Sequence, residues 1–160
     1  MRSGPEPFDS VDAQALCAAQ QAEMLALYEG EADIGPTREA SMFVPPDGVF
    51  VLVRDDAERA VACGGIARFD AVRAEVKRMY VVPDARGRGL GRRVLAELEA
   101  HARHLGYAGL VLETGDRSAA ALAIYESSGF ERIDCWPPYD ARSLSICLAK
   151  RLSSRRSSPT

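Results

Sequence analysis

The spacing of apolar residues alternates between helical and strand periods along the chain. Residues 11–28 repeat apolar positions at helical spacing, and Asp9 and Ser10 ahead of them are suited to cap a helix. The predicted apolar face of this helix consists of Leu16, Met24, Leu25 and Tyr28. Residues 30–48 are rich in turn signals, and a short helix fits only at residues 37–42.

Three strands are predicted after this loop-rich stretch. Residues 49–54 and 60–69 form a hairpin around the turn at residues 55–58, and Gly64-Gly65 indicates a bulge in the return strand. Residues 75–82, with the sequence EVKRMYVV, form the third strand and end at Pro83.

A strand–helix–strand unit follows. Residues 90–105 carry an apolar stripe at helical spacing, and Gly106 is suited to end that helix. The strand at residues 109–114 is then expected to pair in parallel with residues 75–82 through a right-handed crossover. A helix at residues 118–127 and strands at residues 130–135 and 144–148 complete a mixed α/β fold. We expect one domain over residues 1–152 and a disordered tail at residues 153–160.

Composition narrows the class of protein. A length of 160 residues, 47% hydrophobic residues and 27% charged residues are typical of one soluble domain. The net charge of −3 argues against general binding of nucleic acid. No apolar run approaches a membrane span, and the N-terminus does not resemble a secretory signal. A cytoplasmic location follows as the expectation.

The cysteines and histidines do not indicate a metal site. Cys17, Cys63, Cys135 and Cys147 are scattered and are interpreted as packing residues with free thiols, as in cytosolic proteins. His101 and His104 stand three residues apart without an acid or cysteine at a ligand spacing, so no metal is expected.

The sequence RGRGLG at residues 86–91, called the glycine turn below, is the strongest chemical signal. It lies between a predicted strand and a predicted helix, where free backbone N–H groups and the helix dipole favour a phosphate. A mononucleotide P-loop would need Lys and then Ser or Thr after its glycine, and a dinucleotide fingerprint has different spacing. A site for acyl-coenzyme A fits the turn better than either.

Residues 75–133 resemble the GNAT superfamily of N-acetyltransferases. The segment R-x-x-G-x-G from Arg86 to Gly91 is similar to the cofactor signature of that family, and Y-x-x-x-G-F from Tyr125 to Phe130 is similar to its second signature. The resemblance implies a central, mostly antiparallel sheet with a splayed parallel strand pair. It also implies transfer of an acetyl group from acetyl-CoA.

The resemblance assigns a role to each candidate cofactor residue. The strand residues Met79, Tyr80 and Val81 would hold the pantetheine arm, and a backbone N–H there would polarise the thioester carbonyl. Ser118 stands where the family often has an asparagine that contacts the arm, and Ser can also cap a helix. The pyrophosphate would be bound by the backbone amides of Arg86, Gly87, Arg88, Gly89, Leu90, Gly91 and Arg92.

Acetyl transfer needs a base for the amine and a proton for the departing thiolate. By the resemblance, the phenol of Tyr125 donates that proton. Glu75 is the candidate base, because strict alternation places it on the same face as Lys77, Met79 and Val81. Glu113 is the rival for the base or a substrate ligand, and a water relay would make either assignment indirect.

The sequence says little about the acceptor. The helix around Glu23 to Tyr28, the loop at residues 34–47 and residues 135–139 are expected to shape its site. Acids at Glu23, Asp33 and Glu113 would attract a cationic amine, or are surface charges. We expect direct attack by a primary amine of a small molecule or amino acid. A protein or peptide amine and a non-catalytic acyl-CoA-binding module remain alternatives, and a homodimer is the commonest form if the chain associates.

Overall fold

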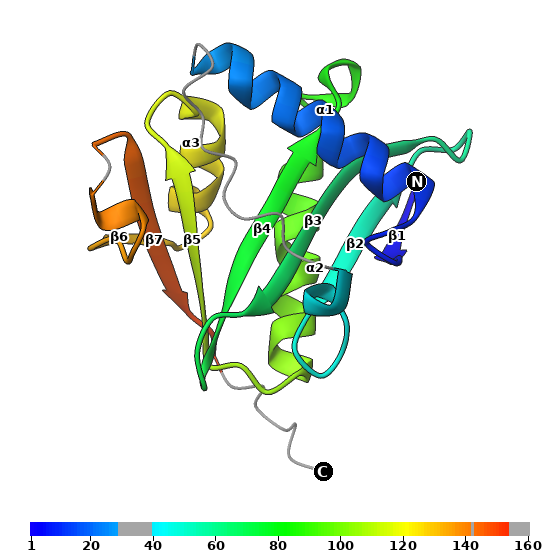
Figure 1. Cartoon of the computed structure of the whole chain (residues 1–160). Helices are drawn as coiled ribbons and strands as arrows, with labels where there is room; N and C mark the ends of the chain where they lie inside the picture. Colours follow the sequence, from blue (N-terminus) through cyan, green and yellow to red (C-terminus); the bar gives the residue numbers. More distant parts are fainter. Residues whose placement is uncertain (29–39, 142, 154–160) are drawn as a thin grey trace.

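A seven-stranded sheet forms the centre of the molecule (Figure 1). The computed structural model describes residues 1–28, 40–141 and 143–153. The strand order is β1-β2-β3-β4-β5-β7-β6, with β4 and β5 parallel and every other neighbouring pair antiparallel. The strands are β1 (Arg2–Pro5), β2 (Val49–Arg54), β3 (Ala60–Arg68), β4 (Arg73–Val81), β5 (Gly109–Gly115), β6 (Glu131–Ile133) and β7 (Ser145–Arg151). The predicted mixed α/β class and the parallel crossover are confirmed.

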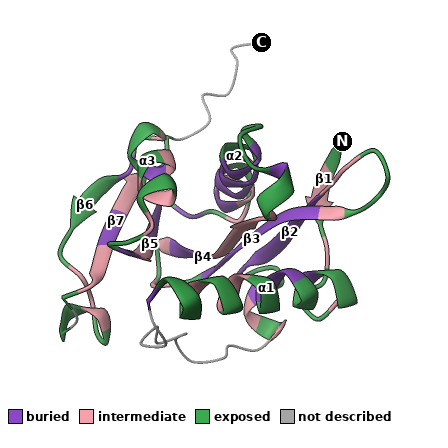
Figure 2. Cartoon of the chain, turned by 90° about the horizontal axis from the view of Figure 1, so that it is seen from above, coloured by how far each residue is buried: buried purple, intermediate pink, exposed green. Residues whose placement is uncertain are grey.

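Three α-helices cover the two faces of the sheet. Helix α1 (Val11–Leu27) lies across one face, whereas α2 (Leu90–His104) and α3 (Ala119–Ser127) lie on the other (Figures 1 and 2). Ser10 caps α1 as predicted, because its side chain accepts a hydrogen bond of 3.1 Å from the Ala13 N–H. Short 3₁₀ helices occur at Ala40–Phe43, Pro83–Ala85 and Tyr139–Ala141.

Each face of the sheet has its own hydrophobic core. Leu95 and Leu98 of α2 are almost fully buried against the sheet, and α3 adds Tyr125 to that core. On the opposite face, Leu16 and Cys17 of α1 pack with Phe50 and other apolar side chains. Burial of these side chains is the main stabilising contribution that holds the helices to the sheet.

The parallel strands β4 and β5 separate after a short contact. They pair only from Arg73–Glu75 opposite Gly109–Val111, although β4 continues to Val81 and β5 to Gly115. The two strands therefore diverge toward their carboxyl ends and form a V (Figure 1). Beyond residue 75, the backbone groups on the β5 side of β4 have no strand partner. Another molecule can therefore form hydrogen bonds with them there.

A bulge in β4 overturns the predicted alternation of faces. Arg78 has a φ of 61°, and Cys63 and Gly65 of β3 lie opposite Tyr80 and Lys77 of β4, so the extra residue belongs to β4. The Gly64-Gly65 signal indicated a bulge in the return strand, so it marked the right level of the sheet but the wrong strand. Left-handed backbone in the middle of a strand inserts an extra residue and reverses the side-chain pattern beyond it. Met79 and Val81 therefore pack on the α2 face, while Glu75 lies opposite Ala67 on the α1 face. The prediction that Glu75, Met79 and Val81 share a face is wrong.

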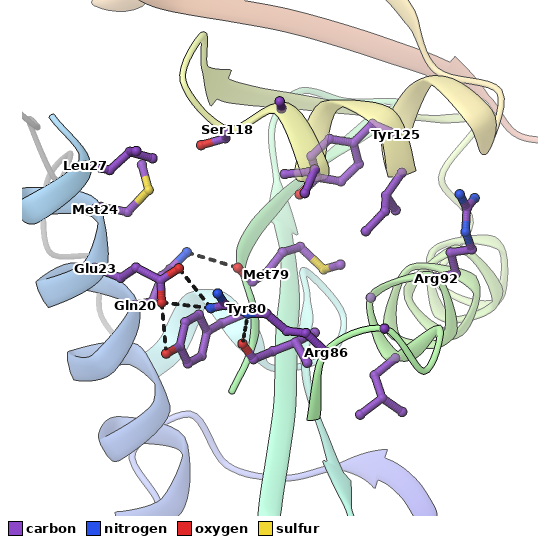
Figure 3. A pocket seen from close by; sticks show the side chains of 18 of the residues that line it. Gln20, Glu23, Met24, Leu27, Met79, Tyr80, Arg86, Arg92, Ser118 and Tyr125 are labelled. Atoms are coloured by element: carbon purple, nitrogen blue, oxygen red, sulfur yellow. Dashed lines mark hydrogen bonds and ion pairs between the residues drawn. The ribbon is translucent and has the colours of Figure 1, made fainter. Parts of the chain in front are cut away.

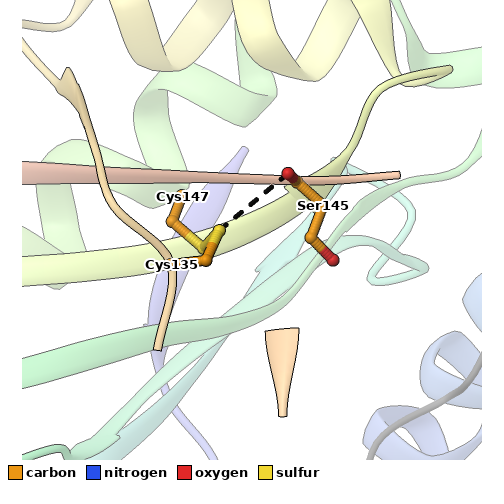
Figure 4. Close-up of a disulfide and its surroundings, with 3 residues drawn as sticks. All are labelled: Cys135, Ser145 and Cys147. Carbon is orange, nitrogen blue, oxygen red and sulfur yellow. Dashed lines mark hydrogen bonds between the residues drawn. A yellow bond between two sulfur atoms is a disulfide. The ribbon is translucent and has the colours of Figure 1, made fainter. Parts of the chain in front are cut away.

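The prediction of four free cysteines is also wrong. Cys135 and Cys147 form a disulfide with Cα atoms 5.2 Å apart (Figure 4). Strand β6 pairs with β7 so that Ile133 lies opposite Cys147, which brings Cys135 close to it. Cys17 and Cys63 are the free, buried cysteines. The cysteines therefore no longer support the expected cytoplasmic location.

Other differences concern the ends of the chain and the surface of α1. Strand β1 was not predicted, because four residues containing Gly4 and Pro5 show no alternation. Leu25, expected on the buried face of α1, is 38% exposed. The loop at residues 34–47, the helix at 37–42 and the tail at 153–160 lie wholly or partly outside the described residues.

Candidate active site

A cavity of about 640 Å³ opens at the carboxyl end of β4 (Figure 3). Its volume lies in the range typical of small-molecule sites. Strand β4 contributes Met79, Tyr80 and Val81 to the lining. The rest of the lining comes from the glycine turn, from one side of α1, and from residues 117–125 at and after the start of α3.

The cavity reaches both faces of the sheet. Val81 packs with the core on the α2 face, whereas Tyr80 packs with the core on the α1 face, and both side chains line the same cavity. This continuity is possible because β4 and β5 have already separated at this level. Two molecules that approach from opposite faces can therefore meet beside β4.

The glycine turn forms one end of the cavity. Gly87 and Gly89 have φ values of 81° and 75°, a left-handed conformation that favours glycine. Gly89 is the N-cap of α2 and supplies no side-chain cap, and the first turn of the helix contains no acid. The N–H groups of Leu90, Gly91 and Arg92 therefore have no partner within the helix. Together with the helix dipole, they favour an anion.

Side chains hold two backbone carbonyls of β4 at the cavity. The Met79 carbonyl accepts a hydrogen bond of 3.2 Å from Gln20 Nε2, and the Val81 carbonyl accepts one of 3.0 Å from Arg86 Nε. Both carbonyls therefore point away from β3, toward the side on which β4 has no neighbouring strand. An extended ligand arm along this edge would meet backbone groups as a strand would.

An ion pair links α1 to the glycine turn. The two carboxylate oxygens of Glu23 accept hydrogen bonds of 2.8 and 2.7 Å from Arg86 Nη2 (Figure 3). The Tyr80 hydroxyl donates to Glu23 at 3.3 Å, and the Arg86 guanidinium lies 5.7 Å from the centre of the Tyr80 ring. Both charged side chains are 45% exposed, so we expect the pair to contribute at most about 1 kcal/mol. Partial burial and the Glu23 carboxylate raise the pKa of Tyr80.

Tyr125 lines the cavity from α3. Its side chain is 7% exposed, and its ring packs edge-on against Phe130 with 5.9 Å between ring centres. Burial, followed by the nearby Glu113 carboxylate, raises the pKa of the Tyr125 phenol well above its ordinary value. The hydroxyl therefore keeps its proton at neutral pH and is suited to donate it rather than to act as a base.

Glu75, Glu113 and Tyr28 lie outside the cavity lining. Glu75 accepts a hydrogen bond of 3.2 Å from Lys77 Nζ, and its side chain is 10% exposed. Glu113 lies within β5 opposite Cys147. Tyr28 is buried, and its hydroxyl accepts a hydrogen bond of 3.0 Å from the Arg117 backbone. Of the named substrate candidates, Glu23 lines the cavity.

The predicted cofactor residues are nearly all at the cavity. Every residue from Met79 to Val81 and from Arg86 to Arg92 lines it except Arg88, which is exposed. Ser118 also lines it, at the N-cap position of α3, but its side chain makes no capping hydrogen bond. The suggestion that Ser118 caps the helix is therefore wrong.

The helix around Glu23 to Tyr28 was expected at the acceptor and Ser118 at the cofactor, but sequence reasoning missed Gln20 and Arg117. Gln20, Met24 and Leu27 recur with Glu23 on one side of α1, and Arg117 precedes α3. The helical spacing of the α1 residues was visible, but it resembles an ordinary buried stripe. Nothing in the sequence around Arg117 predicts its contact with a helix 90 residues earlier.

The described residues give no sign of a metal centre or a membrane span. Within residues 1–28, 40–141 and 143–153, no three His, Cys, Asp or Glu side chains are grouped as metal ligands would be. In the same residues, no helix combines the length and the apolar character that crossing a membrane requires.

The sequence profile of the acetyltransferase (GNAT) family matches residues 14–130. An IAA acetyltransferase of Azospirillum brasilense is 36% identical over 137 residues, which cover 83% of this chain and 89% of that protein. The [ribosomal protein bS18]-alanine N-acetyltransferase of Escherichia coli is 39% identical over 77 residues, 46% of this chain and 52% of that protein.

Solved structures show the same fold. A Klebsiella pneumoniae protein superposes with a TM-score of 0.79 at 30% identity, over 95% of this chain and 97% of that one. A GNAT family acetyltransferase of Elizabethkingia anophelis, solved with acetyl-CoA bound, gives a TM-score of 0.67 at 20% identity, over 94% of this chain and 97% of that one.

Proposed function

Because this chain belongs to the acetyltransferase (GNAT) family, we propose that it transfers the acetyl group of acetyl-CoA to the nitrogen of a primary amine. The acceptor is a small molecule or an amino acid, which attacks the thioester directly. The observation that carries this proposal is the single cavity beside β4, which joins an anion-binding glycine turn to a separate wall on α1. Residues 1–152 form the one catalytic domain of the proposal.

The glycine turn and β4 would hold acetyl-CoA. The first-turn amides of α2 bind the pyrophosphate, and the left-handed glycines let it approach the backbone closely. The open edge of β4 at Met79 and Val81 pairs with the pantetheine arm, and Ser118 offers a hydroxyl on the opposite wall. The thioester contributes an activated acyl group with a thiolate as leaving group.

Tyr125 supplies the proton that the leaving group needs. As the amine nitrogen forms its bond to the acyl carbon, the carbonyl oxygen gains negative charge, which a backbone N–H of β4 stabilises. The carbon–sulfur bond then breaks, and the thiolate takes the phenol proton of Tyr125. An ordinary tyrosine, with a pKa of about 10, already carries this proton at neutral pH, and burial keeps it on the phenol.

The base must act from outside the cavity lining. Glu75 is our candidate, and its carboxylate lies on the α1 face, paired with Lys77. Since it does not line the cavity, we propose that a water molecule relays the amine proton to it. Glu113 remains the rival, because its carboxylate is close enough to Tyr125 to influence the phenol.

Two other functions make different predictions. A protein or peptide amine is favoured by the similarity to the bS18-alanine N-acetyltransferase. A non-catalytic acyl-CoA-binding module would keep the cradle without turnover. A panel of small amines, amino acids and N-terminal peptides, assayed with acetyl-CoA for release of the CoA thiol, separates these cases. Turnover with small amines supports the proposal. Turnover with peptides alone would show that the acceptor is a peptide amine. Tight CoA binding without any turnover would contradict catalysis.

A further inference from the structure

The charges that line the cavity are unequal. Glu23 is the acidic residue in the lining, whereas three arginines, Arg86, Arg92 and Arg117, line it as well. Glu23 is already bonded to Arg86 through both carboxylate oxygens and to the Tyr80 hydroxyl. A cationic amine would have to compete with these contacts. The cavity is therefore a poor site for a polyamine or another acceptor with a second positive charge.

The remaining arginines belong to different ends of the cavity. Arg92 lies in the first turn of α2, beside the glycine turn, and its guanidinium donates to the Ser127 hydroxyl. Arg117 lies across from the glycine turn, where α3 begins and α1 ends. We call the side of the cavity that α1 and the start of α3 form the acceptor wall, and Arg117 is the arginine on it.

Among the described residues, the partners of Arg117 are a carbonyl and an aromatic ring. Its Nη1 donates a hydrogen bond of 3.1 Å to the Leu27 carbonyl, and its guanidinium lies 5.5 Å from the centre of the Tyr28 ring. No carboxylate of the described residues forms an ion pair with it. A guanidinium has five N–H donors in a planar fork, so contact with one carbonyl leaves donors for a carboxylate.

Gln20 is a second polar residue of this part of the lining, and its amide is oriented because its Nε2 donates to the Met79 carbonyl. Its Oε1 is buried, and of the buried side-chain oxygens and nitrogens in the described part of the chain it is the one without a hydrogen bond. Because this oxygen is shielded from solvent, we assign it no contact with the acceptor.

The stretch of α1 between these two groups is apolar. Met24 and Leu27 follow Gln20 at helical spacing and line the cavity. Leu27 also provides the carbonyl to which Arg117 is bonded. The acceptor wall therefore offers two apolar side chains next to a guanidinium.

We propose that the acceptor is an amino acid with an apolar side chain, whose carboxylate binds Arg117. This inference rests on the proposed function and adds the substrate class and one positioning residue. Met24 and Leu27 contact the side chain of the acceptor, which places its amine toward Met79 and the thioester.

Three matched acceptors test the role of Arg117. L-Leucine, L-leucinamide and 3-methylbutylamine share an apolar group, but only leucine carries a carboxylate. Each is assayed with acetyl-CoA in the wild-type protein and in Arg117→Gln, Arg117→Lys and Arg132→Gln. Arg132 is exposed and paired with Glu126 outside the cavity, so it provides the control for loss of a surface arginine. CoA affinity and the melting temperature of each variant are measured in parallel.

The readout is the change in the ratio of kcat/KM for leucine to kcat/KM for leucinamide. The comparison between variants cancels the different amine pKa values of the two acceptors. We expect Arg117→Gln to lower this ratio roughly 10-fold or more, since a charge-assisted hydrogen bond is lost, while Arg117→Lys retains part of it and Arg132→Gln has no effect. Equal losses for both acceptors would mean that Arg117 only supports α1, and would overturn the inference.

The failure of this inference differs from failure of the proposed function. If acceptors without a carboxylate are acetylated as well as leucine, and the ratio does not change when Arg117 is replaced, the proposed acetyl transfer stands and the substrate class is wrong. If none of the three acceptors nor any other amine yields CoA thiol, the proposed function itself fails.

Discussion

Tyr125 combines burial with access to the cavity. Its ring packs against Phe130, while its side chain still contributes to the cavity lining. The spacing from Tyr125 to Gly129 and Phe130 predicted a functional tyrosine from sequence. The structure adds that burial raises the pKa of the phenol, so it stays protonated beyond the ordinary tyrosine range.

Replacement of Tyr125 by phenylalanine removes the hydroxyl and keeps the ring. We expect kcat for acetyl transfer to fall roughly 100-fold, the lower part of the range for loss of a general acid. The affinity for CoA, measured by titration calorimetry, should change little because the packing against Phe130 is retained. An undiminished kcat would contradict the proton-donor role.

The pH profile provides an independent test of the same residue. The pKa of Tyr125 is raised, so its proton is retained up to at least the ordinary tyrosine value of about 10. We expect kcat/KM to rise with pH as the amine and the base lose protons, and to show no decline due to Tyr125 below about pH 10. A falling limb near pH 8 that disappears in Tyr125→Phe would show that the phenol ionises too early for this role.

A single backbone conformation explains the largest error of sequence reasoning about the site. Alternation along EVKRMYVV placed Glu75 beside Met79, but the positive φ of Arg78 reverses the faces beyond it. An arginine gives no sequence signal for left-handed backbone, unlike a glycine or asparagine. The Cys63 thiol donates to the Arg78 carbonyl at 3.2 Å, a contact with a different strand that sequence alone does not reveal.

At the scale of elements, the glycine turn and α2 act together. The turn was predicted from its position between a strand and a helix; the structure confirms that position and adds that Gly87 and Gly89 are left-handed. At the other end of α2, Gly106 has a φ of 90°. The helix is thus bounded by two glycines with similar backbone conformations, only one of which lines the cavity.

These glycines allow a matched test of the anion cradle. An added Cβ meets no atom within 4 Å at either Gly89 or Gly106, so alanine at each position should cost about 1–2 kcal/mol of stability through backbone strain alone. We expect Gly89→Ala to weaken CoA binding about 10-fold or more, because the first-turn amides lose their alignment, and Gly106→Ala to leave it unchanged. Similar CoA affinities in the two variants would contradict the cradle.

The disulfide between Cys135 and Cys147 joins the segment after β6 to β7. In the chain-entropy account, closing a loop of this length stabilises the fold by about 2–4 kcal/mol. We expect Cys135→Ser to lower the free energy of unfolding in urea by about that amount, and a reductant to lower the wild type to the same level. A reductant that leaves the wild type unchanged, or that destabilises Cys135→Ser equally, would contradict this contribution.

At the scale of the whole molecule, the sequence predicts helices and strands better than it predicts the tertiary contacts between them. Strands and helices between residues 49 and 130 were predicted nearly to their ends, because their periodicity is strong and glycine or proline bounds them. The helix around Glu23 to Tyr28 was expected at the acceptor site, but Gln20 and Arg117 were not, since their places depend on contacts between residues 59 to 90 positions apart. Such contacts are set by tertiary packing and leave no local pattern.

The separation of β4 and β5 gives the molecule its site. Two strands that pair over only three residues leave a gap through the sheet, and helices on opposite faces supply the two walls. In the proposed reaction, the glycine turn and β4 hold the acetyl donor with backbone N–H groups and arginine. The acceptor wall carries Gln20, Met24, Leu27 and Arg117. This division of chemistry is what a reaction between two bound molecules requires.

The most direct test of the account follows both products of one reaction mixture. Purified protein is incubated with acetyl-CoA and an amine from the panel, and the CoA thiol and the N-acetylated amine are quantified together by mass spectrometry, with the protein itself examined for acetylation. The account predicts equal amounts of the two products and no acetylated protein intermediate. Release of thiol without N-acetylated amine, or an acetyl group that resides on the protein before it reaches the amine, would contradict direct transfer.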